Sequence, residues 1–269
     1  MEAELRGPIG IFDSGVGGLS VLKEIRKLLP CENLIYVADS AYVPYGNKSP
    51  QFILERSEKI SEFLISKGAK AIVIACNTAT AVSVKPLRIK WPRIPILGME
   101  PAVKPALEKT KTGIVGVLAT VGTLKSAQFA ALLDKFEAKT RVVLQAAPGL
   151  VEYVERGDLD SRELRQLIAS YVSPLVLKGV DVIVLGCTHY PFLREIIQQE
   201  AGVQVALVDT GAAVAKQLKR RLLEYSLLEN VCKGGSAVFY TTGATENTLK
   251  ALSTLLDDLA SFDLKAVII

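Results

Sequence analysis

IVIACNT, at residues 72–78, and IVLGCTH, at residues 183–189, repeat one pattern. Each is a run of mostly β-branched apolar residues that ends at a cysteine, with a threonine within the next two positions. Such a run is typical of a strand buried in a parallel sheet. The sequence therefore places Cys76 and Cys187 alike, at the ends of two similar strands, and its single histidine, His189, follows the second of them.

A second pair of segments supports the idea that the chain contains an internal duplication. IGIFDS at residues 9–14 resembles VGVLAT at residues 115–120. The glycines of this pair are 106 positions apart (from 10 to 116), and the cysteines of the first pair are 111 apart (from 76 to 187). The alternative is that buried parallel strands resemble one another without common descent.

The bulk composition is that of a folded protein without a nucleic-acid or membrane signature. The 269 residues are 49% hydrophobic, which is enough for one large core or two ordinary ones. The formal charge of +4 is spread along the chain, so we expect no nucleic-acid partner. The first residues lack the pattern of a signal peptide, and no apolar run approaches about 18 residues. We therefore expect a cytoplasmic protein with no membrane partner.

The four cysteines are predicted to be free thiols. A cytoplasmic protein keeps its cysteines reduced, and their spacing offers no pair suited to zinc, so we expect neither a disulfide nor a metal site. Their positions are Cys31, Cys76, Cys187 and Cys232.

Strand and helix patterns alternate in two series. In the first, strands are expected near 8–13, 34–38, 71–75 and 94–98, with helices near 19–29, 51–67 and 79–91. In the second, strands are expected near 114–119, 141–146, 181–186 and 203–208, with helices near 123–138, 161–178 and 191–200. Such alternation predicts parallel sheets covered by helices on both faces.

The remainder of the chain breaks this rhythm. We expect a helix near 212–228, a strand at 237–240, another helix, and a final apolar segment at 264–269. Because the second series is already complete, we expect this tail to pack on the first. The prediction is two similar α/β domains related by a pseudo-two-fold axis, the first formed by 1–98 plus 211–269 and the second by 99–210, with the active site in the cleft between them.

Ligands of parallel α/β sheets bind at the carboxyl ends of the strands. If the two rims of strand ends face each other, a small substrate would be enclosed between Cys76 and Cys187. Six residues with reactive or polar side chains lie at or just past such ends: Asp13, Asp39, Cys76, Thr120, Cys187 and Asp209.

The glycine-rich turn at residues 13–18 has the character of an anion-binding loop at a helix N-terminus. It matches neither the dinucleotide-binding nor the P-loop spacing, so a bound carboxylate fits better than a nucleotide. The loop at 42–50 supplies Tyr45 and Gly46, although it could be no more than a turn. Short polar residues on the same rim can bind a ligand or only cap helices, and these are Asn77, Thr78, Thr120, Thr123 and Thr188.

Each reactive residue also has a purely structural interpretation. A buried cysteine can be a small apolar side chain, and a lone histidine can be a satisfied core residue. However, polar residues follow Cys76 and Cys187, and the helix N-termini that come next would lower the pKa of each thiol. His189 lies two positions after Cys187 and could handle protons there, and Asp13 could do the same for Cys76.

With these motifs assembled, the chain closely resembles the glutamate racemases of the aspartate/glutamate racemase superfamily. The resemblance covers nearly the whole chain and rests on several motifs in order. They are GIFDSGVGG (10–18), the segment 39–50, CNTAT (76–80), ATVGT (119–123) and GCTHYP (186–191).

The resemblance implies cofactor-independent interconversion of L- and D-glutamate, supplying D-glutamate for peptidoglycan, in an enzyme that is typically a homodimer. Its catalytic residues correspond to Cys76, Cys187, Asp13, His189 and Glu155. Its substrate contacts correspond to Asp13, Ser14, Tyr45, Gly46, Asn77, Thr78, Thr120, Thr123, Thr188 and His189. Glu152 lies one helical turn from Glu155 and is an alternative partner for His189. The family often has Cys-Pro where this chain has Ala147-Pro148, a cysteine outside the catalytic pair.

Inversion of an α-carbon needs a base on one face and an acid on the other, which two opposed thiols can supply. We expect Cys76 to deprotonate D-glutamate and Cys187 to deprotonate L-glutamate. Aspartate racemase and hydantoin racemase are rival activities within the superfamily, whereas its decarboxylases, for which the resemblance implies one cysteine, are disfavoured. A non-catalytic carboxylate-binding module is a rival outside it.

Overall fold

Two parallel β-sheets form the framework of the protein in the computed structural model, which describes residues 7–134, 141–229, 234–256 and 263–269. One sheet has six strands in the order β10-β9-β2-β1-β3-β4, and the other has four in the order β6-β5-β7-β8. Their bounds are β1 Ile9–Asp13, β2 Leu34–Ala38, β3 Ala71–Ile74, β4 Ile96–Leu97, β5 Ile114–Ala119, β6 Arg141–Ala146, β7 Val182–Gly186, β8 Ala206–Val208, β9 Ala237–Thr241 and β10 Asp263–Ala266.

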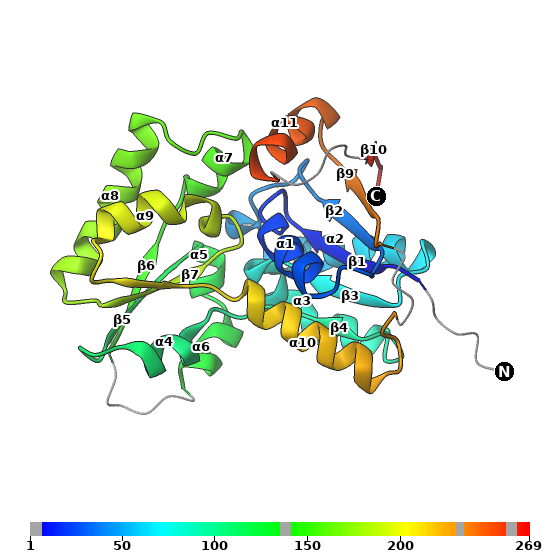
Figure 1. The fold of residues 1–269 in the computed structure, drawn as a ribbon, viewed down its shortest axis with the longest axis horizontal. Helices are drawn as coiled ribbons and strands as arrows, with labels where there is room; N and C mark the ends of the chain where they lie inside the picture. The colour runs from blue at the N-terminus through cyan, green and yellow to red at the C-terminus, as the bar shows by residue number, and fades with distance from the viewer. Residues whose placement is uncertain (1–6, 135–140, 230–233, 257–262) are drawn as a thin grey trace.

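Helices pack around each sheet, and the two halves lie side by side (Figure 1). We call the six-stranded sheet with its helices the first lobe and the four-stranded sheet with its helices the second lobe. The helices are α1 Leu19–Leu28, α2 Pro50–Ser66, α3 Asn77–Lys90, α4 Val103–Lys109, α5 Val121–Leu124, α6 Ala127–Leu133, α7 Leu150–Glu155, α8 Arg162–Leu177, α9 Arg194–Ala201, α10 Gly211–Glu224 and α11 Thr245–Leu255. Short 3₁₀ helices occupy Tyr45–Asn47 (η1) and Tyr190–Leu193 (η2).

The same strand order occurs in both lobes. In the first, β1 pairs with β2 on one side and β3 on the other, and β3 pairs with β4. In the second, β5 pairs in the same way with β6 and β7, and β7 pairs with β8. The central strands β1, β3 and β7 are buried along their whole length, as their continuous apolar runs predicted. The predicted class, two similar α/β units with parallel sheets, is confirmed.

The tail joins the first lobe. Strand β9 pairs with β2, β10 pairs with β9, and α10 packs against α1. In Figure 1 the orange and red segments accordingly lie beside the blue ones. The domain limits at 98/99 and 210/211 themselves stay a prediction.

Two local expectations were wrong. The helix expected at 123–138 is divided within its described part into α5 and α6, because the hydroxyl of Ser126 caps α6 by accepting from the amide of Phe129. Residues 135–138 of that prediction lie outside the described residues. Cys31 is disulfide-bonded rather than free, and the prediction for Cys232 falls outside the described residues.

None of the helices traced in the described ranges combines the length and apolar character needed to span a bilayer.

Candidate active site

The first half-site is built where β1 and β3 end side by side. Phe12 pairs with Ile74 in the register of the two strands, so Asp13 and Cys76 follow neighbouring positions. Both side chains are buried, Asp13 completely. The Cys76 thiol lies 3.9 Å from the Ser14 hydroxyl, which in turn lies 3.4 Å from Asp13 Oδ1. A thiol, a hydroxyl and a carboxyl therefore form one buried chain of proton-carrying groups.

Burial governs the protonation of this half-site. It raises the pKa of Cys76 well above the usual thiol value, and the charge of Asp13 raises it further, whereas the amide of Ala79, which donates to the sulfur at 3.4 Å, lowers it. Cys76 lies directly before α3, as predicted, and its sulfur caps that helix, but the helix N-terminus does not outweigh burial and the nearby carboxylate. Burial also raises the pKa of Asp13, against the lowering effect of His189. Cys76 is consequently a protonated thiol at neutral pH.

The second half-site follows β7. Cys187 lies 3.7 Å from Nδ1 of His189, and the other ring nitrogen of His189 lies 2.6 Å from Glu155 Oε1. Desolvation lowers the pKa of His189, but hydrogen bonds to Cys187 and Glu155 raise it more, and the net pKa is well above the usual imidazole value. The protonated imidazole therefore lies within contact distance of the Cys187 sulfur and can exchange a proton with it. The two half-sites thus share strand geometry and differ in their proton partners.

Glu155 also connects the lobes. It lies at the end of α7 in the second lobe, and its Oε1 accepts a 2.7 Å hydrogen bond from the amide of Val16 in the glycine-rich turn. A Cβ on Gly17 would lie 2.2 Å from Nδ1 of His189, so only glycine allows the turn this close to the imidazole. An amide of the turn thus binds the side-chain carboxylate of Glu155 from the same chain, while the predicted binding of a ligand carboxylate by this turn stays a prediction.

Threonines connect the lobes on another side of the site. The hydroxyl of Thr78, on α3, lies 2.9 Å from that of Thr120 and 3.2 Å from that of Thr123. Gly46 packs against Thr120, because a Cβ at position 46 would lie 2.9 Å from Cβ of Thr120. The first lobe therefore contacts the start of α5 in the second lobe directly, through these side chains.

Asn77 and Tyr45 differ in what they offer a ligand. The Oδ1 and Nδ2 atoms of Asn77 are both buried and have no hydrogen-bond partner among the described residues, although the side chain borders the cavity. Such an orphaned amide is costly unless a ligand satisfies it. The hydroxyl of Tyr45, in contrast, donates to Asp39 Oδ2 at 2.5 Å and is already occupied.

The cavity between the half-sites is narrow. Its free volume is about 10 Å³, which is room for roughly one water molecule. A ligand the size of an amino acid can enter only if the walls move apart. The cavity is lined by Ser14, Pro44, Tyr45, Gly46, Cys76, Asn77, Thr78, Thr120, Val151, Cys187, Thr188 and His189.

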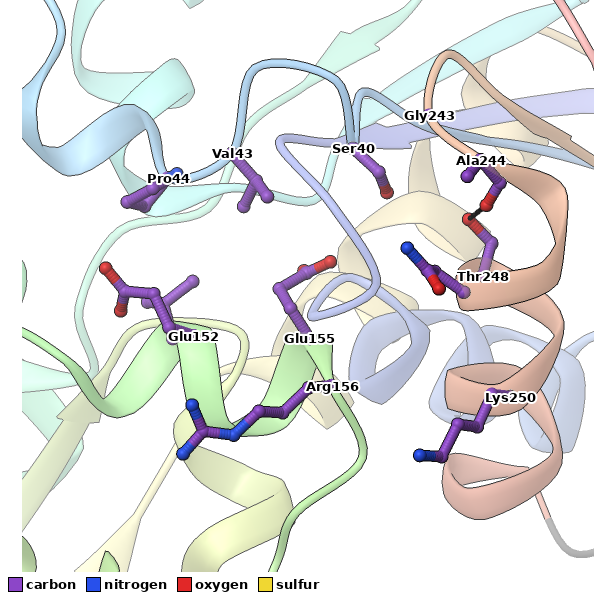
Figure 2. A pocket seen from close by; sticks show the side chains of 12 residues that line it. Ser40, Val43, Pro44, Glu152, Glu155, Arg156, Gly243, Ala244, Thr248 and Lys250 are labelled. Atoms are coloured by element: carbon purple, nitrogen blue, oxygen red, sulfur yellow. Dashed lines mark hydrogen bonds between the residues drawn. The ribbon is translucent and has the colours of Figure 1, made fainter.

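A wider cavity of about 360 Å³ adjoins the narrow one and shares Pro44 and Val151 with it. Figure 2 shows it between the loop that carries Ser40 to Pro44, helix α7 with Glu152 and Glu155, and helix α11 with Lys250. The two cavities therefore have Pro44 and Val151 as a common wall.

Most residues singled out in the sequence meet at this site. Ten of them line the narrow cavity, and the other three contact its lining: Asp13 through Ser14 and Thr188, Glu155 through His189, and Thr123 through Thr78. Of the two candidate glutamates, Glu155 is the one that contacts His189.

Sequence reasoning missed several parts of the site. Pro44 and Val151 line the cavity with no chemical signal beyond being apolar. The use of the Val16 amide could not be anticipated because its partner lies 139 residues away. No group of three or more His, Cys, Asp or Glu side chains is arranged for a metal ion within the described ranges.

Comparison with known proteins agrees with this geometry. The family model described as Asp/Glu/Hydantoin racemase matches residues 9–218. A protein of Stutzerimonas stutzeri named glutamate racemase is 53% identical over 255 residues, which are 94% of this chain and 95% of that protein.

Solved structures are similar over almost the entire chain. A glutamate racemase of Bacillus anthracis superposes with a TM-score of 0.88 at 31% identity and covers 98% of both chains. The Escherichia coli glutamate racemase, solved in complex with L-glutamate and the activator UDP-MurNAc-ala, has a TM-score of 0.82 at 34% identity and covers 97% of both chains.

Proposed function

Since the chain belongs to the glutamate racemases of the Asp/Glu/Hydantoin racemase family, we propose that it interconverts L- and D-glutamate by transferring protons at the α-carbon. Cys76 and Cys187 are the two proton-transfer groups of this proposal. The observation that carries it is their placement: two buried thiols, one from each lobe, line a single cavity and have separate proton partners. A substrate held between them would present one face of its α-carbon to each thiol.

The direction of each half-reaction follows from the unequal surroundings. Cys187, which lies 3.7 Å from Nδ1 of His189, is the base that removes the α-proton of L-glutamate. Cys76, kept protonated by burial and by Asp13, then delivers a proton to the opposite face. For D-glutamate the sequence is reversed: Asp13 accepts the Cys76 proton through Ser14, and His189 gives a proton to Cys187. Cys76 then removes the α-proton of D-glutamate, and Cys187 protonates the opposite face. Each turnover leaves the protons redistributed between the two half-sites.

The negative charge that develops on the substrate needs preorganised donors, because a free α-carbanion is too unstable to form. The amide side chain of Asn77 is buried at the cavity wall with both polar atoms unpaired. Backbone amides of Ser14, Gly46, Asn77 and Thr188 are the further donors that we propose. The described lining contains no lysine that could form a Schiff base, and two thiols are sufficient for the chemistry.

The proposed reaction can be tested with the purified protein. We expect it to convert L-glutamate to D-glutamate without added pyridoxal phosphate, and to convert L-aspartate at a rate lower by at least ten-fold, since one methylene changes binding by about 1–3 kcal/mol. Equal or faster turnover of L-aspartate would instead make it an aspartate racemase. Binding of either amino acid without exchange of its α-proton would make it a binding module.

Three wider assignments belong to the same proposal. We propose that the D-glutamate supplies peptidoglycan synthesis, that the enzyme acts in the cytoplasm, and that it works as a homodimer. The similarity to glutamate racemases over nearly the whole chain supports all three.

A further inference from the structure

Asp39, at the end of β2, is a fully buried carboxylate outside the cavity lining. It accepts four hydrogen bonds from three side chains. Arg56 on α2 donates from Nε at 3.0 Å and from Nη2 at 2.7 Å, Tyr45 donates its hydroxyl at 2.5 Å, and Thr242 donates its hydroxyl at 2.9 Å. The first two bonds form a bidentate pair, which is the strongest and most directional arrangement for these groups.

These contacts fasten the loop at residues 40–47 from several directions. The Arg56 guanidinium stacks on the ring of Tyr42 with its carbon 4.2 Å from the ring centre. The Thr242 hydroxyl accepts from the amide of Ala41 at 3.2 Å while donating to Asp39. The Tyr45 hydroxyl is held by Asp39. Asp39 is thus the common attachment point at the start, middle and end of the loop.

The fastened loop forms one wall of the cavity. Pro44, Tyr45 and Gly46 line it, and Gly46 packs on Thr120 of the second lobe. Because the phenol of Tyr45 is occupied by Asp39, the loop can offer a substrate mainly its backbone amides. The direction of those amides depends on the conformation that Asp39 imposes.

The tail of the chain contributes to the same arrangement. Thr242 immediately follows β9, and Arg56 also donates from Nη1 to the carbonyl of Ile269 at 2.6 Å. Residues more than 200 positions from the loop therefore complete its support. This explains in physical terms why a half-buried threonine after β9 would matter to a site whose reactive groups it does not touch.

We propose that Asp39, held by Arg56 and Thr242, is a positioning residue that sets the loop 40–47 for substrate binding, and that Tyr45 serves the substrate through this anchorage and not through its hydroxyl. The proposal rests on the proposed racemase function. The proposal predicts a change in KM and not in kcat. Donors that bind the substrate equally in the ground state and the transition state alter KM and leave kcat nearly unchanged.

A pair of substitutions at Thr242 tests this most gently, because the residue is half-buried and the change is small. Thr242→Val removes the hydroxyl and keeps the shape, whereas Thr242→Ser keeps the hydroxyl. We expect Thr242→Val to raise KM for glutamate about 3- to 10-fold, as for the loss of one or two hydrogen bonds, with kcat within two-fold of wild type. Thr242→Ser should match wild type in both constants. An unchanged KM in Thr242→Val would overturn the proposal.

Asp39→Asn should have a larger effect, with KM raised more than about ten-fold, because an amide cannot accept from all its present donors. The matched control is Glu32→Gln, which breaks another buried ion pair of the first lobe, Glu32 with Lys70 at 2.6 Å, that has no contact with the loop. This control should lower the melting temperature and leave KM unchanged. If it raises KM as much as Asp39→Asn, the effect is general destabilisation and the proposal fails.

A double-variant cycle separates anchorage from direct contact. If Tyr45 acts through Asp39, Tyr45→Phe combined with Asp39→Asn should raise KM no further than the more damaging single substitution. Effects that multiply would mean that the Tyr45 hydroxyl contacts substrate independently. Amide hydrogen exchange at 40–47, expected to be faster in Thr242→Val and not in Thr242→Ser or Glu32→Gln, gives a readout without turnover. Wild-type protein that fails to racemise glutamate refutes the proposed function, whereas unchanged exchange in Thr242→Val refutes the anchorage.

Discussion

Cys76 and Cys187 occupy equivalent strand ends but have unequal neighbours. A carboxyl and a hydroxyl accompany Cys76, and an imidazole held by Glu155 accompanies Cys187. In the proposed reaction, their equivalent positions give access to both faces of a substrate. Their unequal neighbours supply a different proton partner to each sulfur.

Each thiol should be required for racemisation in both directions. Cys76→Ala should reduce conversion of L- and of D-glutamate to below a few per cent of wild type, because the second face loses its proton donor. The variant should still exchange the α-proton of L-glutamate slowly with solvent through Cys187. Chiral chromatography and proton NMR in deuterated water measure these separately. Racemisation above a few per cent would contradict a reaction that needs two thiols.

Glu155 should control the pH range in which His189 works. The raised pKa of His189 keeps the imidazole charged through neutral pH, and its support is lost as the pH rises through that value. Glu155→Gln removes one cause of the shift, so the alkaline limit of kcat/KM for L-glutamate should move to lower pH, with a loss on the order of 10² in rate above neutrality. The control is Glu152→Gln, one turn earlier on α7 and exposed. Identical pH profiles for Glu155→Gln and wild type would refute the assignment.

At the level of elements, the turn between β1 and α1 depends on the absence of side chains. The Cβ of an alanine at position 17 would lie within 2.6 Å of three atoms of the His189 ring. Gly17→Ala must therefore displace either the turn or the imidazole. We expect a loss of about 10² in kcat, since displacements near 1 Å in a catalytic group have effects of this size, in a protein that keeps its helical circular dichroism. Activity within a few-fold of wild type would show that the turn and imidazole are not closely fitted.

Strands were predictable from sequence because buried parallel strands read as uninterrupted apolar runs, as in 72–75 and 183–186. Their carboxyl ends then placed Cys76 and Asp13 on the rim of one sheet and Cys187 on the rim of the other without further information. The break at Ser126 was missed because the apolar pattern continues across it. The position of Arg56 on the same helical face as the buried Ile53 and Ile60 was a readable sign of a buried ion pair. The partner of Arg56 could not be predicted from the sequence, because its contacts with Asp39 depend on how β2 and α2 pack.

At the scale of the whole molecule, contacts between the lobes close the site. They include Val16 with Glu155, Thr78 with Thr120, and Ser20, whose hydroxyl donates to the carbonyl of Thr188 at 2.8 Å. The cavity they enclose is too small for glutamate. We therefore expect binding to be coupled to separation and renewed closure of the lobes, with hydrogen bonds between the lobes contributing to the closed arrangement.

Weakening one such contact should reduce apparent affinity. Ser20→Ala removes a bond worth about 1 kcal/mol, so we expect KM for glutamate to rise up to about five-fold with an unchanged pH profile. Ser66→Ala is the matched control, because Ser66 donates to a carbonyl within its own exposed helix end at 2.7 Å and contacts no other lobe. Steady-state kinetics measures both. If KM rises in both variants, or in neither, the Ser20 hydrogen bond does not stabilise the closed arrangement of the lobes.

The central claim is that two thiols act on opposite faces of one α-carbon. Its most direct test is wild-type conversion of L-glutamate in deuterated water, followed at early turnover by chiral separation and mass spectrometry. If one thiol removes the α-proton and the other delivers a deuteron from solvent, nearly every D-glutamate molecule formed carries one α-deuterium. The remaining L-glutamate is then unlabelled. D-glutamate that retains its original α-proton would contradict the account.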